Sequence, residues 1–455
     1  MAIREQGLEE QIALWRQYIG HHRAIAQTDV DELEAHLRDQ IDALAASGLA
    51  PDESFLVAVK RLGRTDELSR EFAREHSDRL WKQLVIGETV KTRPESRGVA
   101  IALGLALAAA AAIKLPALFG LTVASAPDFY LRNIAVLILP FLAVYFLLRR
   151  RAGIATIGAV AASFIAAAVI LNSYPFASNG ATELLAVLHA GVALWLVIGV
   201  AYVGGEWRSA SARMDFIRFT GEWVVYFVLI ALGGYALVGL TLGVFGAIGV
   251  SAVGFVGDWM LPCGAAGAVV IAAWLVEAKQ SVIENIVPVL TKLFTPLFTL
   301  MLLALIVSGV LSVLVQHNVI DTQRDLLIIF DLVLIVTLGL LLYSMSARDP
   351  ERPPSWFDAL QLVMVVAALI VDIFVLIAMI GRIDAYGASA NKLASLGLNL
   401  ILLVNLAGAG WLQLRFTRGA ARFPALEGWQ TSYVPIYLAW AAIVVVAFPP
   451  IFAFA

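Results

Sequence analysis

Residues 98–121 read GVAIALGLALAAAAAIKLPALFGL, an apolar run with one charged side chain, Lys114. About 20 consecutive apolar residues are enough for a helix to cross a lipid bilayer. Comparable runs recur through the rest of the chain, so the sequence predicts an all-α polytopic bundle of about eleven transmembrane helices. The predicted spans are 98–121, 133–148, 152–174, 182–204, 219–247, 258–278, 294–316, 325–345, 356–381, 393–414 and 433–454.

The composition of the whole chain agrees with this interpretation. Of its 455 residues 60% are hydrophobic and 15% charged, with a mean hydropathy of +0.83, whereas soluble domains are nearer half apolar and a quarter charged. The net charge of −3 lacks the basic excess typical of nucleic-acid binding. The single cysteine, Cys263, excludes an intramolecular disulfide framework and a cysteine-rich metal site. We therefore expect the lipid bilayer, and no nucleic acid, as the surroundings of this chain.

Charge is concentrated at the beginning of the chain. Residues 1–97 contain 14 of the 32 basic and 18 of the 35 acidic residues. Apolar residues such as Leu8, Ile12 and Trp15 recur there at helical spacing, and a fourth helical pattern begins at Thr65. The sequence thus predicts a soluble four-helix domain over 1–92, a polar linker over 93–97 and a transmembrane domain over 98–455.

The first domain also carries three local motifs. Asp-Val-Asp-Glu-Leu-Glu-Ala-His-Leu begins at Asp29, Gly-Leu-Ala-Pro-Asp-Glu-Ser-Phe occupies 48–55, and Lys-Arg-Leu-Gly-Arg-Thr-Asp-Glu-Leu occupies 60–68. Together they resemble the permease prefix domain and the similar HAAS-type domain, which is associated with PadR-family regulation. In that family such domains precede permeases or other multi-span segments. The resemblance covers under a fifth of the chain and implies a regulatory or docking role without catalytic residues.

Basic residues between the predicted spans indicate the orientation of the chain. With alternate crossings, thirteen Lys and Arg residues fall in loops on the side of the first domain, and four fall in the opposite loops. Cytoplasmic loops carry the excess of Lys and Arg in membrane proteins. We therefore expect a bacterial inner (plasma) membrane protein with a cytosolic N terminus and an external C terminus.

Four ionisable residues fall well inside predicted spans: Lys114, His189, Asp331 and Asp372. At the rise of an α-helix, all four are predicted about 5–6 Å to the outer side of the bilayer midplane. Asp258 is predicted farther out. A charged group at bilayer depth costs at least about 2.5 kcal/mol, so each of these residues is a candidate for a functional site.

The candidate site has two interpretations. In the functional one, the four residues line one water-filled cavity, where they carry protons or coordinate a substrate. In the structural one, Lys114 pairs with one aspartate to fix helix packing, and His189 bonds a backbone carbonyl. The glycine-rich region around Asp258 and Pro262 likewise predicts either close helix packing or a re-entrant segment within 247–262.

Motifs for enzymatic chemistry are missing from the sequence. It contains no Walker-type phosphate loop, His-Glu-x-x-His motif or Gly-x-Ser-x-Gly elbow. Phe255 occupies the position of the first glycine in a Gly-x-Gly-Asp motif that would end at Asp258. We therefore predict no catalytic, cofactor or metal site, and a permease-like protein with a regulatory or docking prefix domain. The alternative is a non-transporting sensor or scaffold that binds a protein partner through residues 1–92.

Overall fold

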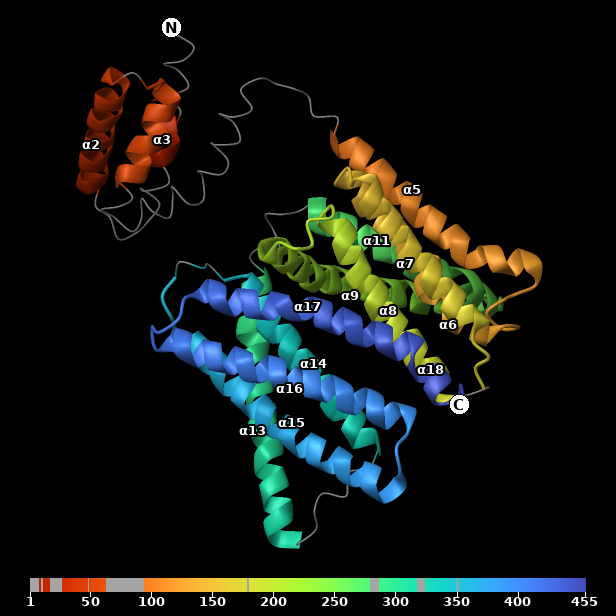
Figure 1. The fold of residues 1–455 in the computed structure, drawn as a ribbon. Coiled ribbons are helices and arrows are strands. Elements are labelled where there is room, and N and C mark those ends of the chain that lie inside the picture. Colours follow the sequence, from red (N-terminus) through yellow and green to blue (C-terminus); the bar gives the residue numbers. More distant parts are fainter. Residues whose placement is uncertain are drawn as a thin grey trace. The chain divides into compact units, whose positions relative to one another are not determined.

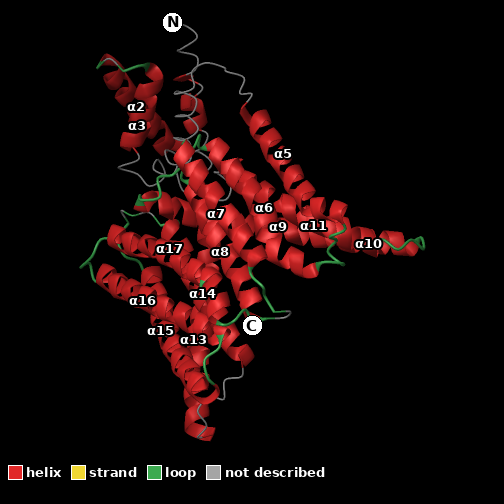
Figure 2. Cartoon of the chain, turned by 45° about the vertical axis from the view of Figure 1, so that its right-hand side comes forward, coloured by secondary structure: helices red, strands yellow, loops and turns green. Residues whose placement is uncertain are grey.

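The structure of the chain is a computed structural model that describes residues 8–9, 11–16, 27–47, 49–62, 94–177, 180–278, 286–316, 324–348, 350 and 352–455. Helices joined by loops make up this part of the chain (Figure 2). The chain divides into two compact units, Met1–Pro94 and Glu95–Ala455.

The first unit is built on two helices, α2 (Gln27–Ala46) and α3 (Pro51–Leu62), with residues 11–16 also helical (Figure 1). Their apolar stripes meet in one small core, in which Trp15 and Leu37 are fully buried. The helix predicted from Thr65 lies outside the described residues. The core residues are Ile12, Trp15, Leu37, Ile41, Leu44, Phe55, Ala58 and Val59.

Arginine and glutamate side chains form a network of ion pairs on the surface of this unit. The Arg38 guanidinium donates two hydrogen bonds to the Glu9 carboxylate, at 2.7 and 2.8 Å, and one to Glu34, at 3.0 Å. Arg16 pairs with the other oxygen of Glu34. The hydrogen bonds from Arg38 lower the pKa of the Glu9 carboxyl below its ordinary value.

The second unit contains the apolar helices. Each predicted span falls on a helix, although the helices extend beyond the predicted ranges at many ends. The helices are α5 (Pro94–Lys114), α6 (Pro127–Arg149), α7 (Ile154–Ser173), α8 (Ala181–Tyr202), α9 (Ala210–Ala247), α10 (Val253–Phe255), α11 (Leu261–Ala278), α13 (Ile286–Gln316), α14 (Arg324–Ser346), α15 (Trp356–Tyr386), α16 (Ala390–Thr417), α17 (Phe423–Val446) and α18 (Phe448–Ile451), with the 3-10 turn η1 (Leu115–Phe119) and the π-helical turn η2 (Val256–Met260).

Ten helices in the described part of the chain are long and apolar enough to cross a membrane. The prediction of an all-helical integral membrane protein is therefore supported. The remaining predicted span, 325–345, coincides with α14, whose described apolar part, Phe330–Ser346, is shorter than the other ten. The sequence predicts a linker over 93–97, but in the structure residues 94–97 are already helical, because α5 begins at Pro94. Proline suits that position, since its missing N–H is unused at the first helical residue.

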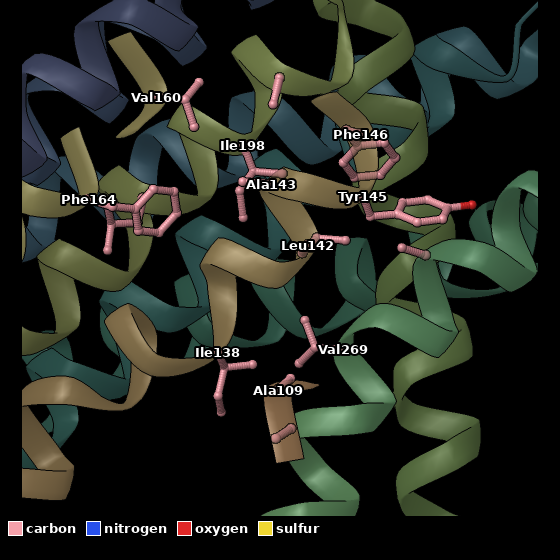
Figure 3. Packing of buried hydrophobic residues seen from close by; sticks show 14 of the residues in the cluster. Ala109, Ile138, Leu142, Ala143, Tyr145, Phe146, Val160, Phe164, Ile198 and Val269 are labelled. Atoms are coloured by element: carbon pink, nitrogen blue, oxygen red, sulfur yellow. The ribbon is translucent and has the colours of Figure 1, made fainter. Parts of the chain in front are cut away.

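Two apolar cores organise the second unit. The first is formed by α5, α6, α7, α8, α9 and α11, and Figure 3 shows Leu142, Phe146 and Ile198 at its centre. The second is formed mainly by α13, α14, α15, α16 and α17, with Leu334, Val371 and Leu402 among its buried residues. Packing of this kind fixes the faces that the helices of each group turn toward one another.

The two groups of helices meet where α8 lies beside α17 (Figure 1). Ala186 and Ala190 of α8 pack there with Val445 of α17 and Leu171 of α7. The small alanine side chains let the helix backbones approach closely, as is typical of helix contacts in membranes. Farther along, α9 also contacts α14 and α17, so this long helix joins both groups.

Two glycines of α16 receive tryptophan rings from α17. A Cβ atom at Gly397 would collide with the Trp440 ring, and one at Gly408 would collide with the Trp429 ring. The Trp429 indole N–H also donates to the Asn405 carbonyl at 3.0 Å. Each ring therefore fits only because the opposing residue has no side chain.

The substitution Gly408→Ala should destabilise the protein, because the added methyl group forces the Trp429 ring away from α16. Overpacking of this kind costs about 1–3 kcal/mol of unfolding free energy. Gly428→Ala is the matched control, since its Cβ has open space within α17. We expect thermal unfolding in detergent to show a lower Tm for Gly408→Ala only. An equal Tm for both variants would contradict the tight contact between α16 and α17.

Candidate functional site

Asp372 is the most completely buried carboxyl group of the described transmembrane helices. It lies near the middle of α15 and has 0% of its surface exposed. Neither carboxyl oxygen has a hydrogen-bond partner. A buried polar group without a partner is costly in an apolar interior, so its presence calls for a physical explanation.

Asp331 on α14 is the second carboxyl group of this site. One of its oxygens accepts a hydrogen bond from the Ser395 hydroxyl at 2.7 Å, and the other accepts one from the Asn399 amide at 2.9 Å. Ser395 and Asn399 are four residues apart on α16 and therefore share one face of that helix. Asp331 and Asp372 are close enough to interact electrostatically. We call these four residues the acid site.

The packing of three helices positions the acid site. Val371 and Val375, which flank Asp372 on α15, belong to the same core as Leu334 of α14 and Leu402 of α16. The first turn of α15 is fixed by a capping box, in which Ser355 and Asp358 exchange hydrogen bonds. Asp358 also accepts a hydrogen bond at 2.6 Å from Arg348, which follows α14. Apolar packing and this ion pair therefore hold α14, α15 and α16 together.

Buried polar side chains continue along α16 beyond the acid site. Asn405 donates to the Tyr437 hydroxyl at 2.8 Å, and Gln413 donates to the Asp358 carbonyl at 3.1 Å. At 100° per residue, Ser395, Asn399, Asn405 and Gln413 lie within an arc of about 120°. From Ser395 to Gln413 the helix rises about 27 Å, close to the thickness of a hydrocarbon core. We call these four residues the polar edge of α16.

Several buried polar side-chain atoms of α16 and α17 have no hydrogen-bond partner. The side-chain oxygens of Asn399, Asn405 and Gln413 are buried and unpartnered, and so are both amide atoms of Gln430 on α17. Because buried polar groups normally find partners, such a concentration is typical of a functional region more than of a packed core.

Lys114 binds a backbone carbonyl, and no ion pair joins it to an aspartate among the described residues. Its ammonium group donates to the backbone carbonyl of Asp258 at 2.5 Å and lies 4.5 Å from the centre of the Trp259 ring. Pro262 explains why this carbonyl can accept from Lys114. Proline has no N–H, so it cannot donate the usual α-helical hydrogen bond to the residue four positions earlier, which is Asp258. Around this position the helix takes the wider π form over Val256–Met260.

The helix geometry around Asp258 also answers the question of how residues 247–262 are arranged. Gly249, with φ +76°, ends the turn after α9, and the helical chain then continues from Val253 to Ala278 as one candidate span. Within the described residues, Val253–Ala278 is thus one continuous helix with a π-helical turn at Val256–Met260. The side chain of Asp258 is exposed.

His189 has a partner within its own helix. Its Nδ1 atom lies 2.8 Å from the carbonyl oxygen of Leu185, one turn earlier on α8. The structure therefore places Asp331 and Asp372 on packed helices, within electrostatic range of each other, and gives Lys114 and His189 backbone carbonyls as partners. The expectation of one cavity lined by all four residues does not describe these contacts.

The sequence interpretation missed several polar partners. Ser395 and Asn399, a serine and an asparagine four residues apart in an apolar span, are a sequence signal for their partnership with Asp331. The sequence interpretation also missed the ion pair between Arg132 of α6 and Glu183 of α8, whose atoms are 2.5 Å apart. Glu277 of α11 binds the two arginines that end α6. Such pairs join distant helices, and sequence spacing alone does not reveal them.

Comparisons with protein-family models, with curated proteins and with solved structures find no match to this chain. Within the described residues, no three His, Cys, Asp or Glu side chains come close enough together to hold a metal ion. The acid site must therefore be interpreted from its own geometry.

The partnership of Lys114 with the Asp258 carbonyl predicts a double-mutant cycle. Lys114→Met should lower the unfolding free energy by about 1.5–3 kcal/mol, because it removes the charged hydrogen bond to the Asp258 carbonyl. In a Pro262→Ala background the cost should be smaller, since the new backbone N–H can serve that carbonyl. Unfolding in detergent measures all four proteins. The same cost in both backgrounds would show that Lys114 acts through another contact.

Proposed function

We propose that this chain is a permease-like protein of a bacterial inner membrane, with a cytosolic N terminus and an external C terminus. Its solute pathway follows the polar edge of α16 between α14, α15 and α17, and passes the acid site. Residues 1–92 act as a regulatory or docking prefix domain. In this proposal the protein transports without a catalytic step or a bound cofactor.

The observation that carries the proposal is Asp372, which is fully buried and has no partner for either oxygen. A carboxyl group retained only for packing gains its stabilisation from a hydrogen bond or an ion pair, and Asp372 has neither in the described structure. In a pathway, the passing ligand, water or proton supplies the missing partner. Ionisable residues inside transmembrane bundles mark such pathways.

Lys114 and His189 have other roles in this proposal. Lys114 supports the π-helical turn around Asp258, and His189 binds a carbonyl of its own helix. The pathway therefore depends on Asp331 and Asp372 among the ionisable residues within the spans.

The experiment is transport by the purified full chain in liposomes, recorded as current on a solid-supported membrane during challenge with amino acids, sugars and organic cations. We expect Asp372→Asn to abolish the current found for the wild type, because asparagine cannot ionise. It should leave expression and Tm unchanged, because asparagine has nearly the same size. Loss of folding in Asp372→Asn would instead assign Asp372 to packing.

Asp384→Asn is the matched control for this experiment. Asp384 lies on the same helix, but its side chain is exposed near the end of α15. The substitution makes the same chemical change outside the acid site, so transport should be unchanged. A current lost equally in both variants would contradict a pathway through the acid site.

One observation favours the second candidate, a sensor or scaffold. Residues 1–94 form a compact unit with a core of its own, as expected of a domain that binds a partner. In this alternative the transmembrane helices anchor the protein and carry no solute.

A comparison of the full chain with a chain lacking residues 1–93 separates the two candidates, because α5 begins at Pro94 and stays intact. Both are purified from native membranes, and mass spectrometry identifies what accompanies each. If the protein transports on its own, we expect both chains to be recovered without a stoichiometric partner and the shorter chain to keep its current. A stoichiometric partner on the full chain only, with no current from either, would support the scaffold.

A further inference from the structure

The two carboxyl groups of the acid site have opposite surroundings. Both oxygens of Asp331 accept hydrogen bonds, from the Ser395 hydroxyl and the Asn399 amide. Both oxygens of Asp372 lack a partner, and the side chain is fully buried. Hydrogen-bond donors stabilise a carboxylate, whereas burial without donors favours the neutral acid. When one carboxyl group of a pair accepts hydrogen bonds and the other is buried without donors, the first tends to be ionised and the second protonated.

The charges around Asp372 favour the same division. The helices packed against α15 are α13, α14 and α16, and the charged group that interacts with Asp372 is the like-charged Asp331. Two interacting carboxyl groups, one fully buried (Asp372) and one partly buried (Asp331), do not readily both ionise. The other charged groups of these four helices lie toward helix ends: Lys292, Arg324, Asp325, Asp358, Arg382, Asp384, Lys392 and Arg415.

We propose that the acid site binds one exchangeable proton, which Asp372 carries while Asp331 remains ionised. Binding takes one proton from water and forms one O–H bond on the Asp372 carboxyl group, and release breaks that bond and returns the proton to water. The inference rests on the proposed function for one point only, namely that this proton drives or gates the movement of solute.

Asn399 contributes both a donor and an unused acceptor to the acid site. Its amide nitrogen donates to Asp331, and its side-chain oxygen is buried without a partner. A neutral Asp372 offers one hydroxyl hydrogen, and the site contains this unused acceptor. The donors and acceptors therefore match when one proton is present, and they do not match when both acids are ionised.

The orientation of the donors also favours a proton over sodium. A bound sodium ion needs several oxygen lone pairs directed at it. At Asp331, the hydroxyl and the amide instead direct hydrogens toward the carboxylate and already stabilise its charge. Sodium is the competing ligand that the experiment must exclude.

The test is infrared difference spectroscopy of the full chain in lipid nanodiscs, between alkaline and acidic pH. The expected result is a carbonyl-stretch band of a buried protonated carboxyl group that shifts in D2O. This band should be lost in Asp372→Asn and retained in Asp331→Asn and Asp384→Asn. Replacing potassium chloride by sodium chloride should leave the band and the Tm unchanged.

Three results would overturn the proposal. They are the absence of the band from the wild type, its retention in Asp372→Asn with loss in Asp331→Asn, and a band or Tm that responds selectively to sodium. The wild-type spectrum and the sodium comparison do not depend on the folding of a variant. A band without solute current would remove the transport function and leave the proton site, whereas a current without the band would do the reverse.

Discussion

A polar group that is buried among apolar helices must find its hydrogen-bond partner within the protein, because no water is there to serve it. Much of this structure follows from that requirement. The Asp258 carbonyl, which Pro262 cannot serve, is bound by Lys114, and Asp331 is bound by two side chains of α16. Among the described carboxyl groups, Asp372 is the one whose buried oxygens lack a partner, and the proposed function depends on it.

The positions of the spans could be predicted because helix length and hydropathy are local properties of the sequence. Eleven apolar runs correspond to helices, and the apolar spacing around Trp15 and Leu37 identifies the core of the first unit. Helix ends were less accurate: α5 begins at Pro94, inside the predicted linker, since a polar first turn looks like a loop in sequence.

Partners between helices could not be predicted in the same way. Similar depth suggested that Lys114, His189, Asp331 and Asp372 converge, but depth says nothing about the direction in which each helix turns its side chains. The packing of α14 and α15 brings the two aspartates together. Lys114 binds the backbone carbonyl of Asp258, and sequence spacing carries no information about such an acceptor on another helix.

The tryptophan rings seated on Gly397 and Gly408 have a mechanical consequence. They fasten α16 to α17 at two points eleven residues apart, about 16 Å along the helix. Sliding between these two helices would drive the rings into backbone, so we expect α16 and α17 to move together. A displacement of α14 against this pair of helices would break the hydrogen bonds that Ser395 and Asn399 donate to Asp331.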